Sequence, residues 1–280
     1  MSLPLGEGAL LGLVQGITEY LPVSSGGHLA LAELLFGSER SDANLASAVL
    51  LHVGTLAATC VALRRRLGSA IEEGLRGIGR PALLNDTPGG RDASFVAVAT
   101  VPTVIVGMAL RHRVESSFTS LFLIGGCFLV TAIVLAATRF QPAGRHGPVS
   151  ESTRKGTPGW AAAMLFGLAQ GVAVVPGISR PAVTIAALLW MGVGAERAFE
   201  LSFLASIPVV AGAIALEARH ALHGDEALAA LGLEAIVAFV AGLGTFYLAR
   251  RIVTRGRMHW LAFYLVPLAF ATLAWGYARP

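Results

Sequence analysis

Apolar segments long enough to cross a membrane recur along the whole 280-residue chain, and this feature constrains its fold most strongly. A helix needs roughly 20 mostly apolar residues to cross the hydrocarbon core. Apolar residues make up 55% of the chain and charged residues 14%, with a mean hydropathy of +0.68. A soluble domain carries about 25% charged residues. These values argue against a soluble globular protein, a disordered chain or a disulfide scaffold, and predict an all-α polytopic membrane protein.

Six segments are predicted to be plain transmembrane helices, whereas two further apolar segments are interrupted. In 8–36 and in 160–191, two short apolar runs flank a stretch rich in Gly, Pro and polar residues. Non-helical backbone survives at membrane depth only where protein or water covers it, so we expect two re-entrant helix pairs. The six plain spans are predicted at 45–63, 93–110, 120–138, 196–217, 229–249 and 258–277.

The two interrupted segments resemble each other. Gly12-Leu-Val-Gln-Gly16 matches Gly167-Leu-Ala-Gln-Gly171, and Pro22-Val-Ser-Ser25 matches Pro176-Gly-Ile-Ser179. Three predicted spans follow each copy, which indicates a duplication within one membrane domain. The predicted repeats are residues 1–140 and residues 159–280.

The basic residues predict the orientation of the chain. If the loop 64–92 is cytoplasmic, that side holds fifteen of the 21 Lys and Arg residues and the opposite side holds five. Both termini then lie outside by the positive-inside rule, and the two repeats are inverted. Inverted repeats with interrupted helices place a polar site near the bilayer midplane. Because topology accounts for the basic residues, we expect no nucleic-acid partner.

The polar residues of the interrupted segments suit phosphoryl transfer. Ionisable groups at membrane depth are costly, so Glu19 and Arg180 would offset one another if the segments meet, as a structural pair or as part of a site. Arg matches phosphate oxygens, and Gly-rich loops at helix starts expose N–H groups to anions. His28 lies three residues after Ser25 and could relay a proton for a serine nucleophile or for water. Glu19 could orient His28, act as the base or hold a divalent cation.

Several of these residues also have a plain structural interpretation. Ser24 could cap the helix that follows it, and Thr184 could bond back to its own helix. His28 could be a helix-start residue that is hydrogen-bonded to the backbone. His52 and Thr55 lie in a predicted span and face either the site or only the bundle.

The stretch from Leu13 to His28, LVQGITEYLPVSSGGH, resembles the first signature of the undecaprenyl-pyrophosphate phosphatase family of the bacitracin-resistance type. Pro176-Gly-Ile-Ser-Arg180, followed by Thr184, resembles its second signature, and the similarity runs over most of the chain. The resemblance implies an integral membrane phosphatase that converts undecaprenyl pyrophosphate to the monophosphate and so recycles the cell-wall lipid carrier. It also implies a bundle of inverted repeats with two re-entrant helix pairs.

The resemblance further implies a divalent cation, Mg²⁺ or Ca²⁺, and a multi-pass protein of the bacterial inner membrane whose site opens to the outer face. The partner is then a polyprenyl pyrophosphate lipid in the bilayer, and a homodimer stays open. The implied catalytic residues are Glu19, Ser25, His28 and Arg180, with Glu19 also a metal ligand. The implied substrate-binding residues are Gln15, Ser24, Gly27, Ser179 and Thr184.

The chain departs from the family pattern beside two of these residues. The family usually has Ser-Arg-Ser-Gly where this chain has Ser179-Arg180-Pro181-Ala182, and some members carry a second glutamate at Gln15. A second glutamate would complete a two-carboxylate metal site. Because this chain has Gln15 at that position, any such metal site is predicted to be weaker here. The alternatives are a lipid-phosphate transporter or flippase of the same fold, a phosphatidic-acid-type lipid phosphatase and an inactive paralogue. The nucleophile is either Ser25 or water.

Overall fold

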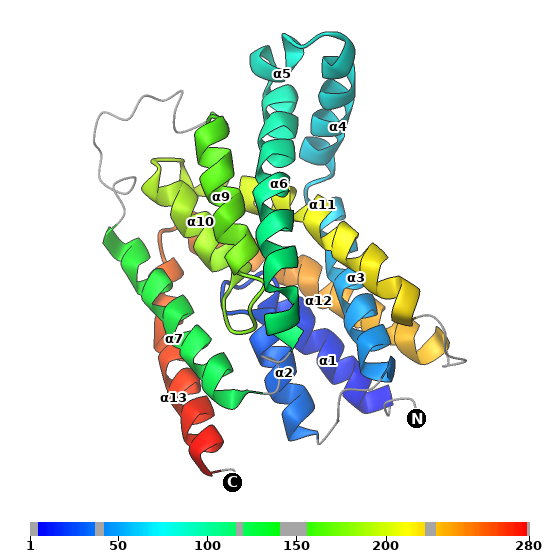
Figure 1. The fold of residues 1–280 in the computed structure, drawn as a ribbon, viewed down its shortest axis with the longest axis vertical. Coiled ribbons are helices and arrows are strands. Elements are labelled where there is room, and N and C mark those ends of the chain that lie inside the picture. Colours follow the sequence, from blue (N-terminus) through cyan, green and yellow to red (C-terminus); the bar gives the residue numbers. More distant parts are fainter. Residues whose placement is uncertain (1–4, 37–41, 116–119, 141–155, 222–227, 279–280) are drawn as a thin grey trace.

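A computed structural model of the protein describes residues 5–36, 42–115, 120–140, 156–221 and 228–278, and all regular structure in these ranges is helical (Figure 1). The predicted outer ends of the two repeats, at 1–4 and 279–280, lie outside the described residues. The α-helices are α1 (Leu5–Thr18), α2 (Ser25–Leu35), α3 (Asp42–Ala62), α4 (Arg64–Gly79), α5 (Leu83–Asp86), α6 (Pro88–Glu115), α7 (Leu121–Ala137), α9 (Trp160–Val172), α10 (Arg180–Trp190), α11 (Ala195–Ala221), α12 (Leu228–Thr254) and α13 (Ala262–Ala278). Two short 3₁₀ turns are η1 (Thr138–Phe140) and η3 (Met258–Leu261).

The chain is a multi-pass membrane protein. Among the described residues, five helices are long and apolar enough to cross a membrane, and they lie in α6, α7, α11, α12 and in η3 with α13. The remaining predicted span, 45–63, falls on α3, which passes the same test together with α4 across an 82° bend. The bend lies where Arg64, Arg65 and Arg66 follow the last apolar residues of α3, and charged residues of this kind end a membrane span.

The segment predicted as a loop at 64–92 is mostly helical. Here α4 packs against α6 and, with the short α5, forms a helical projection at one end of the molecule (Figure 1). Ala70 and Gly77 are buried on the inner face of α4, whereas Ile71, Leu75 and Ile78 remain exposed. The prediction missed α4 because its many charges exclude a span, although an amphipathic pattern supports a helix of this length.

The two interrupted segments are each a pair of short helices with a non-helical break. Residues 19–24 separate α1 from α2, and residues 173–179 separate α9 from α10. In Figure 1, α1 runs inward from the lower edge of the molecule and α9 from the upper edge, and their breaks lie near the centre. A hydrogen bond from Gly177 N to Ser24 Oγ (3.1 Å) joins the two breaks directly.

Small residues allow each short helix to lie closely against a long one. On α1, a Cβ on Gly12 would come within 2.7 Å of the Glu234 carbonyl oxygen of α12. On α9, a Cβ on Gly167 would come within 2.2 Å of the Ala99 carbonyl oxygen of α6. Both distances are too short for any side chain, so these glycines of the repeated motif serve helix packing.

A buried charge cluster joins helix ends on the side predicted to be cytoplasmic. Asp92 of α6 is 1% exposed and accepts hydrogen bonds from Arg66 of α4 (3.2 Å) and Arg197 of α11. Glu200 of α11 pairs with Arg66 (2.7 Å) and with Arg250 of α12 (3.7 Å). Arg66, Arg197 and Arg250, which the positive-inside count assigns to a common side, therefore lie together in one cluster.

Candidate active site

Ser24 connects the two breaks and shapes the floor of the site. Its hydroxyl accepts hydrogen bonds from Gly177 N and Gly27 N (3.4 Å) and lies 3.4 Å from the Ile178 carbonyl oxygen, to which it donates. Ser24 caps α2, as the plain structural interpretation predicted, but it also ties that helix to the second break. It is the one non-glycine residue of the described chain with positive φ, at 75°. Such backbone strain persists only where surrounding contacts impose it.

Two further residues explain why the breaks can approach so closely. A Cβ on Gly27 would lie 2.6 Å from the Phe128 ring and 3.0 Å from Gly177 Cα, so only glycine fits there. Thr131 of α7 donates to the Gly177 carbonyl oxygen (2.7 Å) and accepts from Ser179 N (3.0 Å). Sequence reasoning missed Thr131, because a single threonine in an apolar span usually bonds within its own helix.

Glu19 is the centre of the polar cluster. It follows α1, its side chain is 11% exposed, and its two carboxylate oxygens face different partners. Ser25 Oγ donates to Oε2 at 2.5 Å, and Gln15 Nε2 donates to the same oxygen at 3.2 Å. Arg180 Nη2 donates to Oε1 at 3.3 Å. The structure therefore brings Glu19, Ser25 and Arg180 together, from two segments that lie about 160 residues apart.

Arg180 begins α10 directly after the N-cap Ser179, whose hydroxyl accepts from Ala182 N (3.3 Å). The helix start therefore directs the guanidinium toward the first break, while Pro181 occupies the first turn, where no intrahelical amide donor is needed. Thr184 donates to the Arg180 carbonyl oxygen and contacts Ser202 of α11 (2.7 Å each). Thr184 thus bonds back to its own helix, as its plain interpretation predicted, and also anchors α10 to α11.

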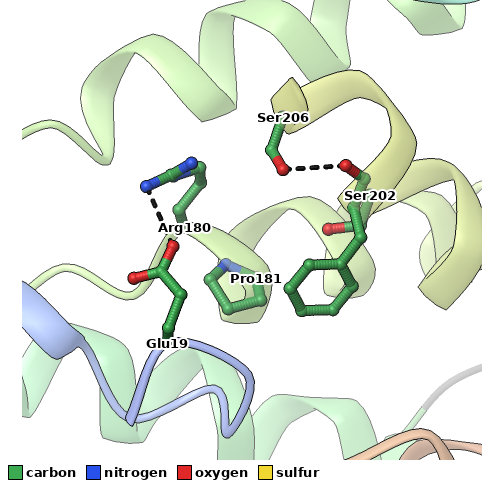
Figure 2. Close-up of a pocket in the computed structure, with 6 residues that line it drawn as sticks. Glu19, Arg180, Pro181, Ser202 and Ser206 are labelled. Atoms are coloured by element: carbon green, nitrogen blue, oxygen red, sulfur yellow. Dashed lines mark hydrogen bonds and ion pairs between the residues drawn. The ribbon is translucent and has the colours of Figure 1, made fainter. Parts of the chain in front are cut away.

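A small pocket lies beside the Glu19–Arg180 pair (Figure 2). Figure 2 shows the carboxylate of Glu19 and the guanidinium of Arg180 pointing toward one another at its edge. The far wall is supplied by α11, through residues that sequence reasoning did not select. The sequence signal that could have identified this wall is the pair Ser202 and Ser206, two serines spaced i, i+4 within an apolar span. The pocket is lined by Glu19, Arg180, Pro181, Ser202, Phe203 and Ser206.

His28 bonds to the backbone at the start of α2, as its plain structural interpretation predicted, and in the described part of the chain it contacts neither Ser25 nor Glu19 through a hydrogen bond. Its Nδ1 lies 2.7 Å from the Ser24 carbonyl oxygen, and its Nε2 lies 2.8 Å from the Tyr264 hydroxyl of α13. The group that accepts from Ser25 in this structure is Glu19. His52 of α3 bonds back to its own helix, with Nδ1 2.8 Å from the Ala48 carbonyl oxygen.

Gln15 supplies an oxygen that could serve a cation. Its side chain is fully buried, and its Oε1 has no hydrogen-bond partner in the described structure. The Nε2 of the same side chain donates to the Glu19 carboxylate, to which the Ser25 hydroxyl also donates, and oxygen donors of this kind suit Mg²⁺ or Ca²⁺. The described residues contain no group of three His, Cys, Asp or Glu side chains that could hold a metal alone. The donor set therefore fits a hard cation that takes its remaining ligands from elsewhere.

Fold and site define a class: a polytopic helical membrane protein in which two interrupted helices contribute a carboxylate, a hydroxyl and a guanidinium to one polar cluster. The family model described as "Bacitracin resistance protein BacA" matches residues 8–271. The chain belongs to this family.

Curated relatives match over nearly their whole length. An undecaprenyl-diphosphatase from Desulfosudis oleivorans is 39% identical, over 95% of this chain and 97% of the relative. Proteins of the same name from Korarchaeum cryptofilum (34%; 96% and 98%) and Treponema denticola (33%; 97% and 98%) are also similar. These matches confirm the predicted family resemblance.

Proposed function

We propose that this protein is a membrane phosphatase that hydrolyses undecaprenyl pyrophosphate to undecaprenyl phosphate and inorganic phosphate. The observation that carries the proposal is the contact of Ser25 and Arg180 with the two oxygens of Glu19. A hydroxyl held by a carboxylate, next to a guanidinium, is the pattern of an activated nucleophile beside an anion-binding group. The names of the relatives at 33–39% identity support the same substrate.

In the proposed mechanism, Arg180 binds the pyrophosphate and Ser25 is the nucleophile. Ser25 Oγ bonds to the terminal phosphorus and gives its proton to Glu19. The bond from that phosphorus to the bridging oxygen breaks, and undecaprenyl phosphate leaves with this oxygen and the proton held by Glu19. Water then attacks the phosphoserine, and Glu19 passes a proton from that water to Ser25 as phosphate leaves. Arg180 neutralises charge on the phosphoryl oxygens throughout.

Direct attack by water is the rival mechanism, with the Nε2 of His28 as the base. The two mechanisms differ in what acid quenching would trap. A phosphoserine at Ser25 supports the covalent mechanism, and Ser25→Ala then loses all measurable turnover. Full retention of activity in Ser25→Ala would exclude Ser25 as the nucleophile.

We further propose that Glu19, Gln15 and Ser25 hold a divalent cation, Mg²⁺ or Ca²⁺. A bound cation would supply charge neutralisation for the phosphoryl group. Among the substrate-binding candidates, Ser24, Gly27 and Ser179 act by shaping the two loops that meet beside the Glu19–Arg180 pair. We expect a chelator to abolish phosphate release and either cation to restore it. Unchanged activity after exhaustive chelation would remove the cation from the proposal.

We also infer two inverted repeats, residues 1–140 and 159–280, each opening with a re-entrant helix pair. The inference is supported by the matching motifs, by the packing of α1 on α12 and of α9 on α6, and by the opposite entry of α1 and α9 in Figure 1. The family resemblance supports a site that opens to the outer face of the inner membrane, and the distribution of basic residues supports the orientation of the chain. Light scattering in detergent would distinguish a monomer from a homodimer.

The function is tested by phosphate release from undecaprenyl pyrophosphate by the purified protein in detergent. The wild type should release phosphate, and Glu19→Gln should lose at least about 100-fold in kcat/KM, the usual scale for a positioned general base. Glu7→Gln is the matched control, because it makes the same change on α1 away from the cluster. A wild-type protein that binds the lipid and releases no phosphate would refute the enzyme and favour a transporter.

A further inference from the structure

The His28 ring is held from three sides. Nδ1 contacts the Ser24 carbonyl oxygen and Nε2 contacts the Tyr264 hydroxyl, at 2.7 and 2.8 Å. The ring planes of His28 and Tyr264 lie within 14° of parallel, with centroids 5.9 Å apart. Phe128 of α7 contacts the imidazole edge to face at 5.2 Å. Residues from the first break, α7 and α13 together therefore fix the orientation of this ring.

These contacts determine where the proton of the neutral ring lies. A carbonyl oxygen can only accept a hydrogen bond, so Nδ1 must carry the proton that bonds to Ser24. Nε2 is then the unprotonated nitrogen, and the Tyr264 hydroxyl donates to it. The nitrogen that Tyr264 covers is the one basic nitrogen of His28.

We propose that Tyr264 is a positioning residue for His28 in the reaction of this protein, an inference that rests on the proposed phosphatase function. Its hydroxyl holds Nε2 at a fixed place next to the turn that carries Ser24 and Ser25, and its ring limits rotation of the imidazole. Tyr264 itself is half exposed, at 51%, on the membrane-spanning helix α13.

His28 and Glu19 therefore have different roles in the proposed site. Glu19 accepts from Ser25 on one side of α2, whereas His28 is directed toward α13. With Nδ1–H bonded to Ser24, the unprotonated Nε2 in this place is suited to accept a hydrogen bond from a water molecule beside the pyrophosphate. Tyr264 should therefore influence turnover more than binding, since Arg180 is the group proposed to bind the substrate.

The test uses Tyr264→Phe, which keeps the stacked ring and removes only the hydroxyl. We expect kcat for phosphate release to fall about tenfold, the effect of one lost hydrogen bond, with KM unchanged within about twofold. Tyr277→Phe is the matched control: Tyr277 lies on the same helix, is 88% exposed, and should keep wild-type kinetics. Equal melting temperatures for wild type and Tyr264→Phe would exclude a folding defect as the cause.

A second readout is independent of activity. In protein labelled with ¹⁵N-histidine, the His28 signals are assigned by their loss in His28→Gln. Nε2 should show the shift of an unprotonated, hydrogen-bonded nitrogen, and in Tyr264→Phe it should move toward the value of a free nitrogen. An unchanged Nε2 shift, or unchanged kcat in Tyr264→Phe, overturns the positioning role. If the wild type itself releases no phosphate, the proposed function fails, while the ¹⁵N shift still reports whether Tyr264 holds His28.

Discussion

The two interrupted segments share a scaffold and differ in chemistry. In both, a Gly-bearing helix packs closely on a long span, and a break with a serine N-cap leads into an 11-residue helix. Yet the position that matches Glu19 in the second segment is Val174, and the position that matches Arg180 in the first is Gly26. Each segment therefore contributes a charge that the other lacks. The residues that match between the two segments therefore form the scaffold of the site, and the residues that differ supply its two charged groups.

The two matched glutamines, Gln15 and Gln170, also differ in their surroundings. Gln15 is bonded to Glu19, whereas Gln170 donates to Thr103 of α6 at 3.2 Å. Both side-chain oxygens are buried without a partner in the described chain. Only Gln15 has a carboxylate beside it, so only the first segment offers a cluster of oxygens to a cation.

The largest loss of activity should follow from removal of Arg180, the charge that only the second segment carries at this position. We expect Arg180→Gln to lower kcat/KM for phosphate release by about 100- to 1,000-fold, because the group that stabilises the phosphoryl charge is lost. Arg251→Gln, an exposed arginine on α12, should stay within about twofold of the wild type. Comparable losses in both variants would show that net charge, rather than the contact with Glu19, sets the rate.

The next effect concerns the scaffold at the second break. Gly177 has φ +97°, and a Cβ there would lie 2.6 Å from Cys127 Cβ and 2.7 Å from the Ile124 carbonyl oxygen. We expect Gly177→Ala to destabilise the fold by roughly 3 kcal/mol or more, from backbone strain and overpacking together. Gly192→Ala has similar strain, at φ +84° with open space around it, and should cost about 1 kcal/mol. Thermal unfolding in detergent measures both, and equal shifts would contradict the close approach of the break to α7.

A smaller effect separates hydrogen bonding from strain at the first break. Ser24→Ala and Ser24→Gly both remove the hydroxyl that accepts from Gly177 N and Gly27 N. Ser24→Ala should cost about 2 kcal/mol, as unpaired buried donors do. Ser24→Gly should cost about 1 kcal/mol less, because glycine adopts positive φ freely. Unfolding measurements that rank Ser24→Ala as the more stable variant would contradict the strained conformation at φ 75°.

The smallest effect should come from the departure beside Arg180. Pro181 is buried in the first turn of α10, where the Ser179 cap already satisfies the free amide of Ala182. Pro181→Ser should therefore change kcat/KM for phosphate release by less than about threefold. A gain of tenfold or more would show that the proline impairs Arg180, in favour of the inactive-paralogue alternative.

Much of this architecture could be predicted from the sequence, because length and hydropathy determine membrane spans. The predicted span 93–110 lies within α6, and both interrupted segments break where Pro and Gly accumulate. Contacts between distant helices could not be predicted in this way. The meeting of Glu19 and Arg180 was a hypothesis drawn from the cost of buried charge. The partnership of Tyr264 with His28 had no signal, because an aromatic residue near a span end usually anchors at the membrane interface.

The central claim is that one carboxylate and one guanidinium from two separate segments act as a unit, and a double-mutant cycle tests it most directly. The cycle compares kcat/KM for phosphate release in wild type, Glu19→Gln, Arg180→Gln and the double variant. The account predicts strong non-additivity: the double variant should be little worse than the poorer single variant, because either change disrupts the same unit. Losses that multiply, so that two 100-fold effects give about 10,000-fold, would show that the two residues act independently and would contradict a shared site.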